Sequence, residues 1–250
     1  MILGATALGA LFGRRVRHLS DSLSEPFGVL QGALLGVVGL ILAFGLSLSL
    51  SRYEDRRAAV VDEANTIGTT YLRAQTLAEP VRSRSLKLLV AYDKSAIRLS
   101  EYVPGSATEL AVTGNEDRLQ RQLWGLAGKA LDAEPTASAP RLYTETLNEM
   151  IDAQTVRIAA LNNQVPGAVL LLEIFGAAVA LGLLSAYLAV VGRGLAGVLL
   201  ASVLVAALLF VTSDLDRPTR GPIQIPDTVL KQQYASMRLP PAAAAPQPAR

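Results

Sequence analysis

The sequence predicts an all-α integral membrane protein, and three observations lead to this prediction. Hydrophobic residues make up 51% of the 250 residues and are gathered into long runs. Three of these runs reach the roughly 20 apolar residues that a helix needs to cross a bilayer. The rest of the chain has helical periodicity and no convincing strand alternation. We expect three full transmembrane helices, a short N-terminal apolar helix, and a helical cytoplasmic bundle inserted between the second apolar segment and a C-terminal transmembrane hairpin.

The three predicted spans are Phe27–Leu50, Gly167–Val190 and Leu195–Thr212. The first and third contain no charged residue, and the second contains only Glu173. The connection between the second span and the third is very short and contains Gly192-Arg193-Gly194. These two spans must therefore form a tight antiparallel hairpin, which we assign to residues 167–213.

The N-terminal apolar run, Ile2–Gly13, is too short to cross a bilayer. Arginines follow it, whereas a signal peptide carries its positive charge before the apolar stretch. We expect a shortened or partly inserted helix and a basic linker within residues 1–26. A wrongly assigned start codon would give the same pattern.

Basic residues near the span ends predict the orientation of the chain. Four lie on one side and six on the other: Arg14, Arg15, Arg17 and Arg193 against Arg52, Arg56, Arg57, Arg157, Arg217 and Arg220. The richer side is expected to be cytoplasmic. This places the central block and the C-terminus in the cytoplasm.

The central block, residues 51–166, is charged and predicted to be helical. Its apolar residues recur every three or four positions, as in helices buried along one face. The expected helices are Glu54–Leu77, Val81–Tyr102, Asp117–Ala133 and Ala139–Asn163. Because no proline lies between Leu50 and Leu77, the first helix should continue the first span. Residues 214–238 are expected to form a charged exit segment, and residues 239–250 a disordered tail rich in proline and alanine.

Composition excludes several functional classes. The 23 basic and 21 acidic residues are too evenly balanced to suggest nucleic-acid binding. The chain has no cysteine, and His18 is its one histidine, so Cys-based and multi-His metal sites are excluded. There is no phosphate-binding loop or nucleophile elbow. We expect no enzyme activity and no cofactor.

Two segments carry a family resemblance. The first runs from Ser51 to Arg73, and the second is Asp214-Leu215-Asp216-Arg217-Pro218, followed by Gly221 and Ile223. Together they resemble the signatures of the bacterial bestrophin-like membrane family, a group long labelled a domain of unknown function. The motif residues are Arg52, Glu63, Ala64, Asp214, Asp216, Arg217 and Pro218.

This resemblance implies a bacterial inner-membrane protein that forms a homo-oligomer and conducts inorganic ions. True bestrophins, to which the resemblance is distant, are pentameric anion channels. The calcium-clasp acidic run of those proteins is absent from this sequence, so the resemblance does not imply calcium gating. The family usually has a full first span where this chain has a short apolar run.

Four polar residues in the spans are candidate pore or structural sites: Gln31, Ser47, Ser49 and Glu173. Glu173 lies about 10 Å along a helix from Pro166. A carboxylate at that depth is either functional or reaches the headgroups or caps a bundle contact. Ser47 and Ser49 lie on opposite sides of their helix, and we expect ordinary backbone hydrogen bonds for both.

Two other features have alternative readings. The stripe formed by Gly32, Gly36 and Gly39 allows close helix packing, which we expect to be intramolecular rather than between subunits. Glu63 could pair with Arg56 or Arg57 or with a neighbouring subunit, or lie on a solvated face.

The charged exit also has two readings. Asp214, Asp216 and Arg217 form either a collar at a pore mouth or, as we favour, a structural helix stop before Pro218. We further expect this exit to pack beside the first cytoplasmic helix, with Arg52, Arg56 or Arg57 within reach of Asp214 or Asp216.

Three functions remain open at this point. The resemblance favours an oligomeric ion channel. A non-conducting membrane-anchored scaffold or sensor is the alternative, because the spans are poor in the polar side chains that line water-filled pores. A transporter is the weakest hypothesis, since Glu173 is its single candidate coupling carboxylate and no internal repeat is visible.

Overall fold

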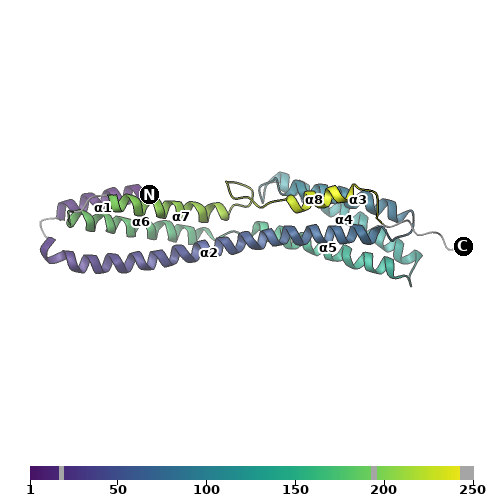
Figure 1. The fold of residues 1–250 in the computed structure, drawn as a ribbon, viewed down its shortest axis with the longest axis horizontal. Coiled ribbons are helices and arrows are strands. Elements are labelled where there is room, and N and C mark those ends of the chain that lie inside the picture. The colour runs from purple at the N-terminus through teal and green to yellow at the C-terminus, as the bar shows by residue number, and fades with distance from the viewer. Residues whose placement is uncertain (17–19, 193–195, 243–250) are drawn as a thin grey trace. The chain divides into compact units, whose positions relative to one another are not determined.

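The computed structural model describes residues 1–16, 20–192 and 196–242, and these residues form an all-α protein as predicted. The helices, labelled in Figure 1, are α1 (Ile2–Val16), α2 (Ser20–Ala74), α3 (Val81–Leu99), α4 (Ala107–Ala133), α5 (Ser138–Asn162), α6 (Gly167–Val190), α7 (Ala196–Leu215) and α8 (Thr228–Met237). They divide into two compact units. Unit 1 contains residues 1–52 and 164–216, and unit 2 contains residues 53–163 and 217–250.

The three expected spans are confirmed by length and composition. Candidate membrane spans lie within Gly28–Ala74, Ser138–Val190 and Ala196–Leu215. Helix α2 is a single helix of 55 residues, which confirms that the first span continues into the central block. Much of the predicted hairpin connection lies outside the described residues. Gly192, at its start, has a φ of 73°, a left-handed conformation that glycine adopts without a steric cost.

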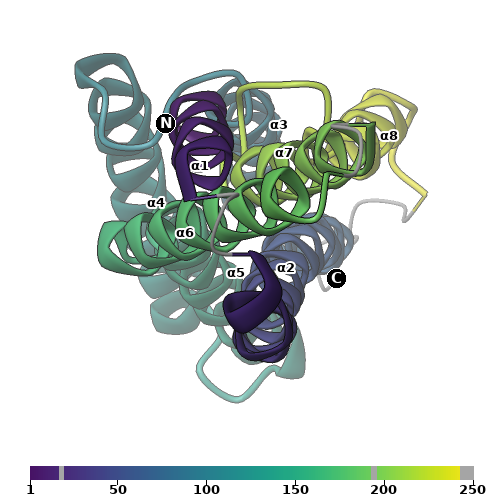
Figure 2. The same ribbon diagram turned by 90° about the vertical axis from the view of Figure 1, so that its left-hand side faces the viewer.

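In unit 1, α6 lies between α1 and α2, as the end-on view shows (Figure 2). Gly9 and Gly13 of α1 lie against the backbone of α6, since a Cβ at these positions would be 2.0 Å from the Gly182 oxygen and 2.3 Å from the Ala186 oxygen. The Ser185 hydroxyl donates to the Thr6 carbonyl at 2.7 Å. Small residues therefore permit a close backbone approach, which is a common way for helices to associate in lipid.

Helix α1 has 15 residues and is therefore about 22 Å long. This is shorter than the roughly 30 Å hydrocarbon core of a bilayer. It remains a short apolar helix, as expected, and α6 covers one of its sides.

The expectation of intramolecular packing for the glycine stripe of α2 is wrong. A Cβ placed on Gly32, Gly36 or Gly39 would meet no atom of the described chain within 4 Å. The face of α2 that does pack on α6 lies elsewhere on the helix and contains Val38 and Leu42. The glycines therefore form part of an uncovered face of the protomer.

In unit 2, the C-terminal half of α2 packs with α3, α4, α5 and α8 around one apolar core. The largest fully buried apolar and aromatic side chains of this unit are Ile67, Leu77, Leu89, Tyr92, Leu99, Leu123, Tyr143, Leu147 and Met150. All but Leu77, which follows the end of α2, come from four helices (α2, α3, α4 and α5) whose apolar residues repeat at helical spacing. This core confirms a helical bundle in the central block.

Two features of unit 2 differ from the sequence expectation. Helix α4 begins at Ala107 rather than Asp117, because the Ser106 hydroxyl caps it by accepting from the Glu109 amide at 3.2 Å. Helix α8 lies within the segment expected only as a charged exit. Its Leu230 is fully buried in the bundle core, so packing rather than local pattern explains this short helix.

Candidate functional site

A buried ion pair joins Glu63 of α2 to Arg157 of α5 in unit 2. The Arg157 Nη1 atom donates to Glu63 Oε2, and the two side chains are 1% and 0% exposed. Arg157 Nη2 also donates to the Ala96 carbonyl at 3.0 Å and to Ser100 Oγ at 2.7 Å. The predictions that Glu63 pairs with Arg56 or Arg57, or lies on a solvated face, are therefore wrong.

Arg56 makes a different set of contacts within the same unit. Its Nε donates to the Ala160 carbonyl at 3.1 Å, and its Nη2 donates to the Asn163 carbonyl at 2.7 Å. These acceptors lie at the C-terminus of α5, where the last carbonyls of a helix have no partner within it. Arg56 thus caps α5 and fixes the α2–α5 contact.

Hydrogen bonds extend the ion pair into a polar network. The Tyr92 hydroxyl donates to Glu63 Oε1 at 3.4 Å. Gln120 Nε2 donates to the Tyr92 hydroxyl at 3.3 Å and to Gln154 Oε1 at 2.8 Å. Gln154 Nε2 in turn donates to Glu116 Oε2 at 2.7 Å. The network crosses the core from α2 through α3, α4 and α5.

Two further carboxyl groups belong to this buried region. Burial, with the nearby negative charge of Glu63, raises the pKa of Asp93 from 3.8 to about 7. The same two causes raise the pKa of Glu116 from 4.5 to about 7. Arg157 opposes both shifts but is already paired with Glu63. The site therefore contains three carboxyl groups around one guanidinium.

Three of the candidate span residues lie inside unit 1. Gln31, Ser49 and Glu173 are at most 9% exposed. Glu173 of α6 packs against Gly45 of α2, where a Cβ would come within 1.6 Å of its Oε1 atom. Ser47 lies on the exposed side of α2, opposite Ser49 as expected.

The contacts of these residues correct two readings. Neither carboxyl oxygen of Glu173 has a hydrogen-bond partner among the described residues, and its burial against α2 contradicts the reading that it reaches the headgroups. Ser49 Oγ also lacks a partner in the described part of the chain, so the expected backbone hydrogen bond is wrong for this residue.

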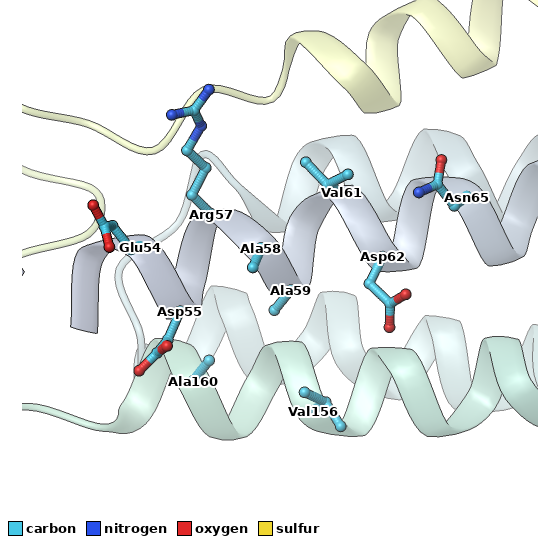
Figure 3. Close-up of a pocket in the computed structure, with 10 residues that line it drawn as sticks. All are labelled: Glu54, Asp55, Arg57, Ala58, Ala59, Val61, Asp62, Asn65, Val156 and Ala160. Carbon is cyan, nitrogen blue, oxygen red and sulfur yellow. The ribbon is translucent and has the colours of Figure 1, made fainter. Parts of the chain in front are cut away.

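A groove of about 850 Å³ lies between α2 and α5 in unit 2 (Figure 3). Figure 3 shows Asp55 and Asp62 of α2 on the side that faces α5, with Val156 and Ala160 of α5 opposite them. Glu54, Arg57 and Asn65 also line it, together with Ala58, Ala59 and Val61. Three acidic residues against one basic residue give the groove a negative character.

The sequence matches the bestrophin-like domain over residues 1–230. This match covers nearly the whole chain. The chain belongs to the bestrophin-like family. No match was found among curated proteins.

The bestrophin-like fold is also found in solved structures. A bacterial bestrophin homologue from Klebsiella pneumoniae aligns with a TM-score of 0.65 and 18% identity, over 95% of this chain and 97% of the other. A single-residue variant of that homologue aligns with a TM-score of 0.69 and 18% identity, over 94% and 97%. A structure described only as a membrane protein variant gives a TM-score of 0.71 and 16% identity, over 94% and 96%.

The family-motif residues fall in both units. Glu63 and Ala64 are buried in the bundle, with Ala64 in its apolar core. In unit 1, Asp216 Oδ1 accepts from the Val165 amide at 2.9 Å, which ties the end of α7 to the residues just before α6.

The other motif residues differ in how deeply they are buried. Asp214 and Pro218 are buried and Arg217 is exposed. Arg52 is half-buried, and its Nη1 atom has no partner among the described residues. Contact between the exit and the root of the bundle stays a prediction.

Sequence reasoning missed most of the buried network. Arg157 was counted only as an orientation charge, and Asp93, Glu116, Gln120 and Gln154 were not singled out. A signal was nevertheless present in α4. Glu116 lies four residues before Gln120, and Gln120 lies three residues before Leu123. The three side chains therefore share one face of α4, and the apolar Leu123 indicates that this face is buried.

Proposed function

We propose that the protein is a non-enzymatic subunit of a homo-oligomeric ion-conducting pore in a bacterial inner membrane, with the bundle on the cytoplasmic side. Family membership supports this proposal, since the resemblance implies oligomeric channels that conduct anions. The fold adds apolar spans for the bilayer and a helical bundle for contacts between subunits.

The observation that carries the proposal is the uncovered face of α2. In unit 1 this face contains Gly32, Gly36, Gly39, Ala43 and Ser47, all exposed and three or four residues apart. Small residues at this spacing let two helices approach closely in lipid. Further copies of the chain fit such a face, because small residues let neighbouring α2 helices lie close together around a shared axis.

The C-terminal half of α2 also has an uncovered face within unit 2. Glu54, Ala58, Asn65 and Thr69 are exposed there, and the first three line the acidic groove. These residues are polar or small, as expected for a helix that faces water or a neighbouring subunit rather than a core.

A non-conducting scaffold is the second candidate, and one observation favours it. Gln31, Ser49 and Glu173 lie between the helices of one protomer, so Ser47 is the single candidate polar residue on the uncovered face. An axial pore lined by this face would be mainly apolar in the membrane. Such a pore can still conduct if it gates by dewetting.

Reconstitution into planar bilayers tests the proposal. The purified full chain should elute as an oligomer in detergent and give single-channel currents under a salt gradient. The reversal potential reports whether anions carry the current, as the resemblance implies. Gly36→Leu should abolish the oligomer or the current, since a bulky side chain would fill the uncovered face.

The matched control is Leu204→Phe on α7, at a residue that is 62% exposed and apart from this face. It should leave both oligomer and current unchanged. A monomeric chain would contradict the proposal. A stable oligomer without current at any voltage or gradient would favour the scaffold.

A further inference from the structure

Asp93 of α3 and Glu116 of α4 are buried carboxyl groups that the proposed pore does not use. Both residues are 0% exposed. Neither oxygen of Asp93 has a hydrogen-bond partner among the described residues. Oε1 of Glu116 has none with good geometry, although the Ser95 hydroxyl lies close enough to favour the charged form of Glu116. The other Glu116 oxygen accepts from Gln154. A buried carboxylate without partners is costly, whereas a neutral acid is tolerated.

The charges around these groups also oppose their ionisation. Glu63 on α2 is negative, and Tyr92 on α3 supplies only a hydroxyl that donates to Glu63. Arg157 on α5 is the one cation that affects both groups, and Glu63 already pairs with it. On α8, which packs against α3, Lys231 pairs with Asp227 at 2.8 Å. Ionisation would therefore place two uncompensated negative charges in the bundle core.

We propose that Asp93 and Glu116 form a proton-binding site whose occupancy keeps α3 and α4 packed in the bundle. The described residues contain no cluster of three or more His, Asp or Glu that could hold a metal ion. A proton, which needs only a single carboxyl oxygen, is the cation that this site accepts. The site makes bundle packing sensitive to pH, and it does so whether or not the protein conducts ions.

The raised pKa values fix the sign of this effect. Asp93 and Glu116 have ordinary pKa values of 3.8 and 4.5, and both rise to about 7 in the folded chain. Between these values the folded chain holds protons that the unfolded chain has released. Stability from the site is therefore fully present below about pH 4 and is lost as the pH rises through about 7.

Infrared difference spectroscopy on the full chain in detergent tests proton binding directly. The wild-type protein should show a protonated-carboxyl band at about pH 6 that disappears by about pH 8.5. Asp93→Asn and Glu116→Gln should each remove part of this change. Glu173 is also buried and can contribute a band, but that band would be the same in all variants. Loss of the effect in either variant supports the site, even if the other fails to fold.

Thermal unfolding tests the effect on packing. The wild-type midpoint should fall between about pH 5 and pH 7.5, whereas the double variant Asp93→Asn/Glu116→Gln should lose most of this fall. The control is Glu149→Gln on the exposed side of α5, which should behave as the wild type does. A carboxyl band that is unchanged between these pH values, or that changes in both single variants by as much as in the wild type, would overturn the proposal. So would a wild-type midpoint that rises over this range.

Discussion

The Glu63–Arg157 ion pair is the residue-scale feature on which the bundle core depends most. It is fully buried, and Arg157 makes three kinds of contact, to a carboxylate, a carbonyl and a hydroxyl. Removing one partner of a buried pair leaves the other charge uncompensated. Replacing both with apolar residues avoids that penalty, so single and double variants should behave differently.

Arg157→Met should destabilise the bundle by about 3–5 kcal/mol, because Glu63 is left buried without a counter-charge. The double variant Glu63→Met/Arg157→Met should recover part of this loss. Chemical denaturation of the full chain in detergent measures both values.

The control for this pair lies on the surface of the same unit. Glu145 is 62% exposed and lies 3.7 Å from Arg73, so Glu145→Gln should change stability by no more than about 1 kcal/mol. Equal effects of Arg157→Met and Glu145→Gln would show that the buried pair has no special role.

Only part of this site could be predicted from the sequence. Glu63 was identified through the family motif, but its partner was expected nearby in sequence, at Arg56 or Arg57. The actual partner, Arg157, lies on another helix. Long-range pairing of this kind depends on how the helices are arranged, and a single sequence contains no direct record of that arrangement.

At the scale of elements, the sequence predicted the long apolar helices best. The bounds of α6 were predicted to the residue, because Pro166 and the end of the apolar run mark them. The sequence also predicted that the first span continues into the central block, and both lie in the single helix α2. The start of α4 was missed although Ser106 and Glu109 form a recognisable capping pattern. Helix α8 was missed because it depends on tertiary burial of Leu230 rather than on its own pattern.

The contact between α1 and α6 supports a prediction at this scale. Gly9→Ala should weaken the packing of α1, because the new Cβ would lie 2.0 Å from the Gly182 oxygen, a backbone atom. Gly4→Ala on the same helix should have no such effect, since its Cβ would meet nothing within 4 Å in the described chain. Limited proteolysis of the N-terminal segment in detergent measures the difference. Equal protection of the two variants from the protease would contradict this account of the contact between α1 and α6.

At the scale of the whole molecule, α2 links the fold to the proposed function. It is the one described helix that contributes to both units, and in each unit it has an uncovered face. The sequence predicted a small-residue stripe on this helix but assigned it to packing within the protomer. The assignment failed because a stripe shows only which residues share a face, and not which neighbour covers it.

The most direct test of the account is whether α2 of one copy lies beside α2 of another. The chain contains no cysteine, so single cysteines can be introduced without a background. Gly36→Cys, on the uncovered face, should form covalent oligomers with a short bifunctional thiol reagent in dilute proteoliposomes. Leu204→Cys, on the outer side of α7, should not. Cross-linking at Leu204 but not at Gly36, or equally weak cross-linking at both, would contradict a central position for α2.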